Sequence, residues 1–218
     1  MKYNAKLIGY TKPIGIPAET PEGLIAYCAR RSSGKPRNEW HEDYEGLLRY
    51  CIRNKHWSVF DMVDAVIELD GPRDILRQVL RHQSCKFQEF SQRYSDDIQF
   101  TTRDVRRQDD KNRQNSIDDF HEQMKREFEA DCEETAQVAL DFYNKWRRLD
   151  AAKECCRVFL PEGLTMSNMA IKGSVRSWLH YIDVRDDEGV TQWEHVQVAR
   201  AIRREIAPLF PAAFGDIK

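Results

Sequence analysis

The segment 71–107 carries the side chains best suited to chemistry. It contains eight basic and five acidic residues, within a chain whose formal net charge is −2. A helix over 72–82 would gather its polar side chains on one face, because each residue advances by about 100°. That face carries Arg77, Gln78, Arg81 and His82. Guanidinium groups with nearby serine hydroxyls suit a phosphate, and glutamine amides suit a base or ribose edge. The segment therefore indicates an anionic ligand such as a nucleotide.

A polar helical face is more often simply solvated, and the common phosphate-binding loops are missing. Neither GxGxxG nor the P-loop pattern GxxxxGKS/T occurs, so the sequence favours neither a Rossmann nor a P-loop site. The six cysteines form no CxxC pair and no zinc spacing with histidine. We therefore expect no metal site, and we interpret Cys85, Cys155 and Cys156 as reduced, packed thiols rather than nucleophiles.

A thirteen-residue stretch changes this assessment. Arg81-His82-Gln83, then seven residues, then Ser91-Gln92-Arg93 resembles the signature RHR-x7-S-x-R of flavin-dependent thymidylate synthases. Further stretches of the chain match patterns of that family in the same order, so the resemblance covers nearly the whole sequence. These are LIGYT near the start, His56 to Asp61, Gln78, Cys156 to Pro161, Ser174-Val175-Arg176, His180, Arg185, and Gln192-Trp193-Glu194.

The resemblance implies an enzyme that makes dTMP from dUMP, with methylenetetrahydrofolate as carbon donor, NADPH as reductant and FAD as hydride carrier. It implies a homotetramer whose active sites are shared between subunits, and no cysteine nucleophile. By the same resemblance, dUMP would be held by Gln78, Arg81, Glu89, Ser91, Gln92, Arg93, Arg157 and Arg185. FAD would be held by Ser58, Arg81, His82, Gln83, Glu89, Ser174, Arg176 and His180.

Arg185 is the catalytic residue that the resemblance implies. A fixed positive charge beside the uracil ring would stabilise negative charge as C5 becomes nucleophilic. The chain departs from the family pattern at Gln83, where the family usually has Arg, at Gln88 and Ser174, where Asn is common, and at Gln92, where Gly is common. A glutamine can hydrogen-bond a flavin or phosphate oxygen but cannot neutralise its charge, so we predict weaker FAD binding than in a Gln83→Arg variant.

Two other functions stay open on the residues alone. The first is a non-catalytic protein that binds a nucleotide or RNA through the basic segment 71–107. The second is an enzyme scaffold that lost its activity through the change at Gln83. Flavin absorbance of the purified protein, the salt dependence of RNA binding, and tritium release from C5-labelled dUMP would separate these possibilities.

The elements that must position these residues are mostly helices. Alternating apolar residues predict strands at 5–10 and 63–69, and a short β-like piece at 98–102. Apolar residues at spacings of three and four predict a long helix at 116–148, opened by Ser116 and Asp119, whose aromatic residues lie in the core or at a subunit interface. Further helices are predicted at 21–32, 40–54, 72–82, 150–157, 167–182 and 190–206, with a loop at 34–38.

We therefore expect one α+β domain over 1–218, with a small, mostly antiparallel sheet flanked by long helices. Hydrophobic residues make up 41% and aromatic residues 11% of the 218-residue chain, which argues against disorder. The small negative net charge excludes a globally basic nucleic-acid coat. No apolar run approaches the ~20 residues of a membrane span and no signal-peptide core opens the chain, so we expect a cytoplasmic protein.

Overall fold

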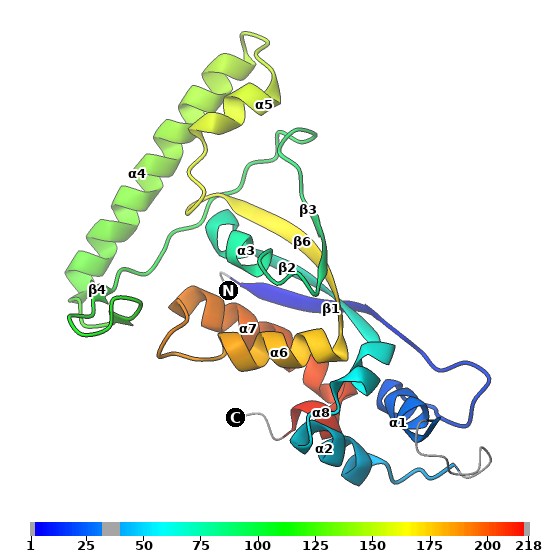
Figure 1. Cartoon of the computed structure of the whole chain (residues 1–218). Coiled ribbons are helices and arrows are strands. Elements are labelled where there is room, and N and C mark those ends of the chain that lie inside the picture. Colours follow the sequence, from blue (N-terminus) through cyan, green and yellow to red (C-terminus); the bar gives the residue numbers. More distant parts are fainter. Residues whose placement is uncertain (1–2, 32–39, 216–218) are drawn as a thin grey trace.

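The structure is a computed structural model that describes residues 3–31 and 40–215. Its centre is an antiparallel four-stranded sheet of order β1-β2-β6-β3 (Figure 1). The strands are β1 (Asn4–Tyr10), β2 (Asp64–Pro72), β6 (Met166–Ser174) and β3 (Lys86–Glu89). The two central strands pair over nine residues, from Asp64 opposite Ser174 to Pro72 opposite Met166. The predicted α+β class with a small antiparallel sheet is confirmed, and that sheet includes both predicted strands.

The prediction of one helix over 167–182 is wrong. Residues 166–174 form β6, and the helix α6 (Val175–Arg185) begins only afterwards. Alternate residues of β6 are buried, which is the burial pattern of a strand, but the buried set includes Ser167 and Gly173, which hide the apolar alternation. Ser174 caps α6, because its Oγ accepts a hydrogen bond from the Ser177 amide.

Helices cover the sheet and close the core. The α6 helix and α7 (Trp193–Ile206) pack against each other beside the sheet, and α8 (Pro211–Phe214) lies below them (Figure 1). Trp178, Ile202 and Phe210 are fully buried there. The remaining elements of this body are α1 (Pro21–Arg31), α2 (Glu45–Arg53), the short helix η1 (Trp57–Met62), α3 (Arg73–Val79) and η3 (Ala207–Leu209). In the described part of the chain, no helix is both long enough and apolar enough to cross a membrane.

A long excursion of the chain projects from this body (Figure 1). It leaves and returns at neighbouring points, because Phe100 and Thr165 form a β-bridge and the Thr101 amide donates to the Leu164 carbonyl at 2.9 Å. We call the segment 101–164 the arm. It contains the hairpin of β4 (Arg107–Gln108) and β5 (Ser116–Ile117), then α4 (Glu122–Arg147), α5 (Lys153–Cys156) and η2 (Arg157–Phe159). The Phe100 bridge confirms the β-like character predicted at 98–102.

The predicted long helix exists but begins at Glu122 rather than at 116. Ser116 lies in β5 and Asp119 pairs with Arg107, so neither residue caps α4. Only Cys132, Ala136, Ala139 and Tyr143 of α4 are buried. The apolar residues beside them are exposed, with Trp146 at 43%, so most of the predicted apolar face lies outside the core.

Most other predicted elements are found with shifted ends. The helices predicted at 21–32, 40–54, 72–82, 150–157 and 190–206 correspond to α1, α2, α3, α5 and α7. The loop predicted at 34–38 lies outside the described residues. The strand β3 was not predicted, because its four residues alternate too briefly to show a pattern.

Candidate active site

The signature residues lie between α3 and the edge of the sheet. Gly71 and Pro72 end β2 and direct the chain into α3, which ends at Val79. Tight turns follow, in which the His82 amide donates to the Val79 carbonyl at 3.1 Å and the Cys85 amide donates to the His82 carbonyl at 3.0 Å. The chain then enters β3, which pairs with β6. The signature thus follows directly after a helix of seven residues, about 10 Å long.

His82 and Arg185 form a direct contact at the C-terminal end of α3. The Arg185 Nε donates a hydrogen bond to His82 Nε2 at 3.0 Å, and the His82 ring packs edge-on against Tyr181, with ring centroids 4.7 Å apart. The His180 ring lies 6.5 Å from His82. Burial, followed by the positive charge of Arg185, lowers the pKa of His82 to about 4. His82 is therefore a neutral hydrogen-bond acceptor at physiological pH.

A second group of expected residues gathers at the N-terminus of α6. Ser174 Oγ donates to Asp61 at 2.8 Å, and Arg176 forms an ion pair with the same carboxylate at 2.9 Å. Ser58 is exposed on the helix η1, which also carries Asp61. The Ser177 hydroxyl donates to the Ser84 carbonyl at 3.4 Å and so holds the turn 81–84 against α6.

This arrangement presents a surface rich in hydrogen-bond donors, which we call the α6 surface. It consists of Ser58, Arg81, His82, Gln83, Ser174, Arg176 and His180. FAD carries a pyrophosphate and a polar ring edge, and such groups need cationic and hydroxyl donors. The donor set of the α6 surface therefore fits the cofactor that the sequence predicts.

A polar cavity of about 360 Å³ lies at the opposite end of α3, which we call the arginine cavity. Three arginines, Arg73, Arg77 and Arg157, line it together with the buried side chain of Gln92. Its volume is near the lower limit of small-molecule sites. Arg157 lies on η2 at the end of the arm. The fold therefore brings it to the same cavity as Gln92 of the signature, although the two residues are far apart in the sequence.

Arg73 is a buried cation with incomplete hydrogen bonding. Its side chain is 8% exposed, and its Nη1 lies 3.3 Å from Glu89 Oε1 at an angle that makes no hydrogen bond. Ser167 donates to the same Glu89 oxygen at 3.1 Å. A buried polar nitrogen without an acceptor is costly, so an anion in the arginine cavity would stabilise Arg73.

Carboxylates pair with two further arginines at or near the arginine cavity. Arg77 pairs with Glu162 at 3.4 Å, and Arg93 pairs with Glu154 at 3.1 Å, in both cases at exposed positions. The Arg93 amide donates to Ser91 Oγ at 3.3 Å, and Gln92, which stands between these two residues in the signature, lines the cavity. Exposed ion pairs of this kind are weak, about 0–1 kcal/mol, and an incoming dianion can replace their carboxylates.

Gln78 lies in the last turn of α3, in a chain of partly buried hydrogen bonds. Its Nε2 donates to Gln192 at 2.7 Å, and its Oε1 lies 3.3 Å from His195 Nδ1. The Tyr181 hydroxyl lies 3.0 Å from His195 Nε2, and Gln192 donates to Glu194 at 2.9 Å. Burial lowers the pKa of His195 to about 3. Tyr181 and His195 were missed by the sequence reasoning, and only the neighbouring Gln192-Trp193-Glu194 pattern pointed to this part of α7.

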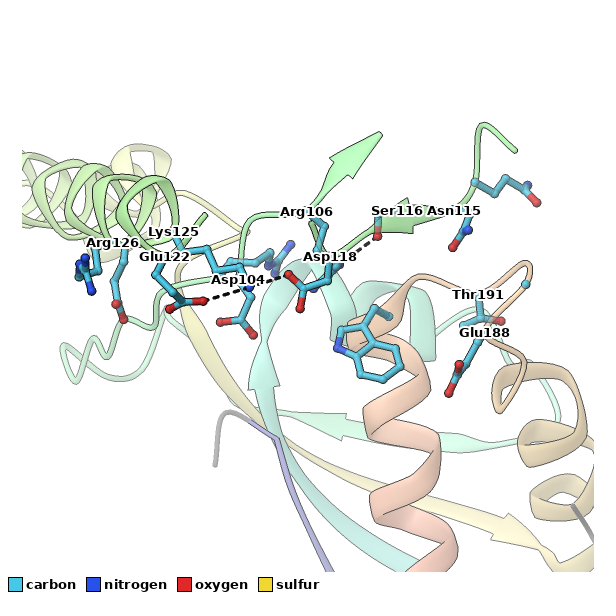
Figure 2. Close-up of a pocket in the computed structure, with 15 residues that line it drawn as sticks. Asp104, Arg106, Asn115, Ser116, Asp118, Glu122, Lys125, Arg126, Glu188 and Thr191 are labelled. Atoms are coloured by element: carbon cyan, nitrogen blue, oxygen red, sulfur yellow. Dashed lines mark hydrogen bonds and ion pairs between the residues drawn. The ribbon is translucent and has the colours of Figure 1, made fainter. Parts of the chain in front are cut away.

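A cavity larger than the arginine cavity, about 860 Å³, lies elsewhere, between the arm and the start of α7 (Figure 2). None of the residues expected to bind dUMP or FAD is among the described residues that line it. Acidic and basic side chains alternate around it and largely pair, as in the contact of Lys125 with Asp118 at 2.7 Å. Because these charges cancel, this cavity has no clear preference for an anion.

The fold and the site geometry together define a class, which the comparisons identify. A UMP/dUMP methylase, PolB from Streptomyces cacaoi, has a crystal structure similar to this one, with a TM-score of 0.83 at 20% identity, over 98% of this chain and 93% of that one. This likeness assigns the chain to the α+β fold of that methylase. The model of the family described as "Thymidylate synthase complementing protein" matches residues 6–212.

Relatives over the full chain agree. The flavin-dependent thymidylate synthase of Synechocystis sp. is 45% identical over 218 residues, covering 99% of both chains. A probable flavin-dependent thymidylate synthase of Paramecium bursaria Chlorella virus 1 is 41% identical over 211 residues, covering 96% of both. The chain belongs to the family of flavin-dependent thymidylate synthases, and the family predicted from the signature is confirmed.

Proposed function

We propose that this chain catalyses the FAD-dependent reductive methylation of dUMP to dTMP, with methylenetetrahydrofolate as carbon donor and NADPH as reductant. Family membership supports the reaction. The observation that carries the proposal within the structure is the arginine cavity, in which Arg73, Arg77 and Arg157 surround a space suited to a phosphate. The arginine cavity lies at one end of α3 and the α6 surface at the other. This arrangement suits a nucleotide whose phosphate lies in the cavity and whose base lies beside a flavin.

The residues around the arginine cavity bind the nucleotide in this proposal. The phosphate lies near Arg157 and Gln92, and Ser91 and Arg93 add donors from the signature turn. Glu89 is held near Arg73, where its carboxylate is available to a ribose hydroxyl. Gln78, near the end of α3, and Arg81, in the turn after it, follow toward the base.

The residues of the α6 surface, together with Glu89, bind FAD, which supplies the hydride transfer. Arg81, Arg176 and His180 offer donors to its phosphates and ring, and Ser58 and Ser174 add hydroxyl groups. Ser174 and Arg176 are held in place by Asp61, so the donors are oriented before a ligand arrives.

Arg185 stabilises the uracil ring in this proposal. Its Nε is fixed by His82, which leaves the other guanidinium nitrogens to donate to the acceptor oxygens of the pyrimidine. The charge of Arg185 favours the build-up of electron density that makes C5 nucleophilic, which is electrostatic stabilisation of the transition state.

We expect a homotetramer in which the active sites are shared between subunits. The α6 surface and the arginine cavity both open at the molecular surface, and α4 exposes apolar side chains beside its buried ones. Sedimentation of the flavin-loaded enzyme across a dilution series, with activity measured in parallel, tests this expectation. A monomer with full activity would contradict it.

The test of the reaction begins with the absorption spectrum of the purified protein. We expect flavin bands, followed by tritium release from C5-labelled dUMP that requires methylenetetrahydrofolate and NADPH. A colourless protein that binds RNA with steep salt dependence would instead support the non-catalytic alternative. Flavin binding without tritium release would support an inactive scaffold.

A further inference from the structure

A directed chain of hydrogen bonds connects the arm to the interior. It starts at the ion pair of Arg106 with Glu194, whose side chains are only 12% and 3% exposed, and it continues through Gln192. From there it reaches Gln78 on α3, His195 on α7 and finally Tyr181 on α6. The six side chains therefore tie four separate parts of the fold together.

The carboxylate of Glu194 determines the direction of the first two links, from Gln192 and from Gln78. An ionised carboxylate only accepts hydrogen bonds, so Gln192 must turn its amide nitrogen toward Glu194 and its oxygen toward Gln78. Gln78 must then donate from Nε2, at 2.7 Å, and its own oxygen must face His195. The hydrogen-bond network thus determines which end of the Gln192 and Gln78 side-chain amides is the nitrogen and which is the oxygen.

The same logic fixes the tautomer of His195. Its Nδ1 faces the Gln78 oxygen at 3.3 Å and must carry the proton, so Nε2 accepts from the Tyr181 hydroxyl at 3.0 Å. His195 is fully buried and Tyr181 is 1% exposed, so these polar groups depend on each other for hydrogen bonds. The lowered pKa of His195 agrees with a neutral ring that has one donor and one acceptor.

We infer that Tyr181 and His195 are positioning residues: His195, held by Tyr181, acts together with Gln192 to keep the Gln78 amide oriented for the nucleotide. They hold the Gln78 oxygen inward, so the second N–H of Gln78 is the group left for a ligand. The carbonyl and phosphate oxygens of dUMP accept such a donor, whereas a reversed amide would present an oxygen and repel them. This inference rests on the proposed function, in which Gln78 contacts dUMP.

Tyr181 links this role to the other proposed catalytic group. The ring of Tyr181 packs against His82, which in turn holds Arg185. One buried tyrosine therefore supports a nucleotide contact through its hydroxyl and the partner of Arg185 through its ring. Removal of the hydroxyl alone separates the two contributions, because Tyr181→Phe keeps the ring.

Calorimetric titration of the flavin-loaded enzyme with dUMP tests the inference. We expect Tyr181→Phe to weaken dUMP binding by about 3- to 10-fold, the range of one hydrogen bond, without changing flavin affinity. Tyr143→Phe is the matched control, since Tyr143 is also buried and hydrogen-bonded but lies on α4, and it should change dUMP binding less than 2-fold. In a Gln78→Ala background, Tyr181→Phe should have no further effect, as a double-mutant cycle requires.

A second variant and a spectroscopic signal keep the test independent of stability. His195→Leu removes both ring nitrogens and should weaken dUMP binding at least as much as Tyr181→Phe. Nitrogen NMR of labelled histidine should show His195 protonated at Nδ1 in the wild type, and the Nε2 signal should shift in Tyr181→Phe, which removes the donor to that nitrogen. Tight dUMP binding by the wild type and both variants would overturn the inference alone. Absence of dUMP binding by the wild type would overturn the proposed function and the inference with it.

Discussion

The positive charge of Arg185 is not offset by its hydrogen-bond partner, because that partner is a neutral ring. Its Nε donates to His82 at 3.0 Å, and the pKa of His82 is lowered to about 4. A carboxylate in the same place would fix the guanidinium equally well but would cancel its charge. In the proposed function, the neutral imidazole therefore orients Arg185 and leaves its charge available to the substrate.

Replacement of Arg185 by alanine should remove turnover and leave the flavin bound. We expect tritium release from C5-labelled dUMP to fall by about 100-fold or more, because one preorganised electrostatic group contributes several kcal/mol to the transition state. Flavin absorbance after gel filtration reports cofactor binding in the same sample. Arg204→Ala is the control, since Arg204 is an exposed arginine on α7. Joint loss of flavin and of the folded structure would show that Arg185 is structural.

Gln83 is the one signature position where this chain lacks the charge that the family usually has. It is exposed in the turn before β3. We expect Gln83→Arg to tighten FAD binding by roughly 5-fold, because an exposed charge contact contributes up to about 1 kcal/mol. Fluorescence titration of the flavin-free protein measures this change, with Gln83→Lys separating charge from guanidinium geometry. Equal or weaker binding by Gln83→Arg would refute the prediction.

The chemistry of single residues was only partly readable from the sequence. The signature predicted roles for Arg81 and His82, and a further stretch that resembles the family predicted one for Arg185. No sequence pattern pointed to Arg73 or His195. His195 contacts a residue 117 positions away, and no local pattern reports a hydrogen bond between a helix near the centre of the chain and another near its end.

At the scale of elements, β6 shows why a strand can be missed when only the apolar pattern of its own residues is considered. Its buried positions include Ser167, which is satisfied by Glu89, and Gly173, where an added Cβ would lie 3.0 Å from Cys85 Sγ. Both residues occupy the apolar face without being apolar. Their environment is created by neighbouring strands, so it exists only after the sheet has formed.

Glu22 joins two elements from opposite ends of the chain. It lies in the first turn of α1, is 3% exposed, and accepts a hydrogen bond from the Ala213 amide of α8 at 2.9 Å. Burial, opposed by hydrogen bonds from the backbone of Ala213 and Ala212, raises the pKa of Glu22 to about 7. The folded protein therefore holds a proton on Glu22 at pH values where the unfolded chain does not.

The contribution of Glu22 to the free energy of unfolding should fall as pH rises. Its stabilising contribution is complete below its ordinary pKa of 4.5 and is lost as pH rises through about 7. Glu22→Gln stays neutral, so its free energy of unfolding relative to the wild type should increase between pH 5 and 8 by up to ~3 kcal/mol. Urea unfolding at several pH values measures the difference, which cancels the opposite effects of His82 and His195. A difference independent of pH would contradict the assignment.

At the scale of the whole molecule, α4 carries an apolar stripe that the body does not cover. Along one side of this 26-residue helix, which is about 39 Å long, lie exposed apolar side chains. They are Met124, Phe128, Val138, Phe142 and Trp146, with Leu149 just beyond the helix. Exposed stripes of this size are typical of protein interfaces. The sequence indicated the stripe but could not tell core from interface, because both produce the same spacing.

A charge in this stripe should disrupt the expected tetramer. Val138 is 48% exposed near the middle of the stripe, so Val138→Glu should leave the subunit folded and shift its sedimentation toward smaller species. Asn144→Glu introduces the same residue on the opposite side of α4 and should not change the assembly. Activity and sedimentation measured over the same dilution series would connect assembly with catalysis. Identical behaviour of the two variants would exclude the stripe as an interface.

The arm begins and ends at adjacent backbone positions, since Phe100 bridges to Thr165. An inserted segment with neighbouring ends can change length at little cost in chain entropy, because that cost grows only with the logarithm of segment length. Relatives can therefore diverge in the size and surface of this protrusion while the register of the central strands stays the same. For protein engineering, the junction is a natural point for exchanging arms between family members. Such chimaeras must keep Arg157 at the arginine cavity.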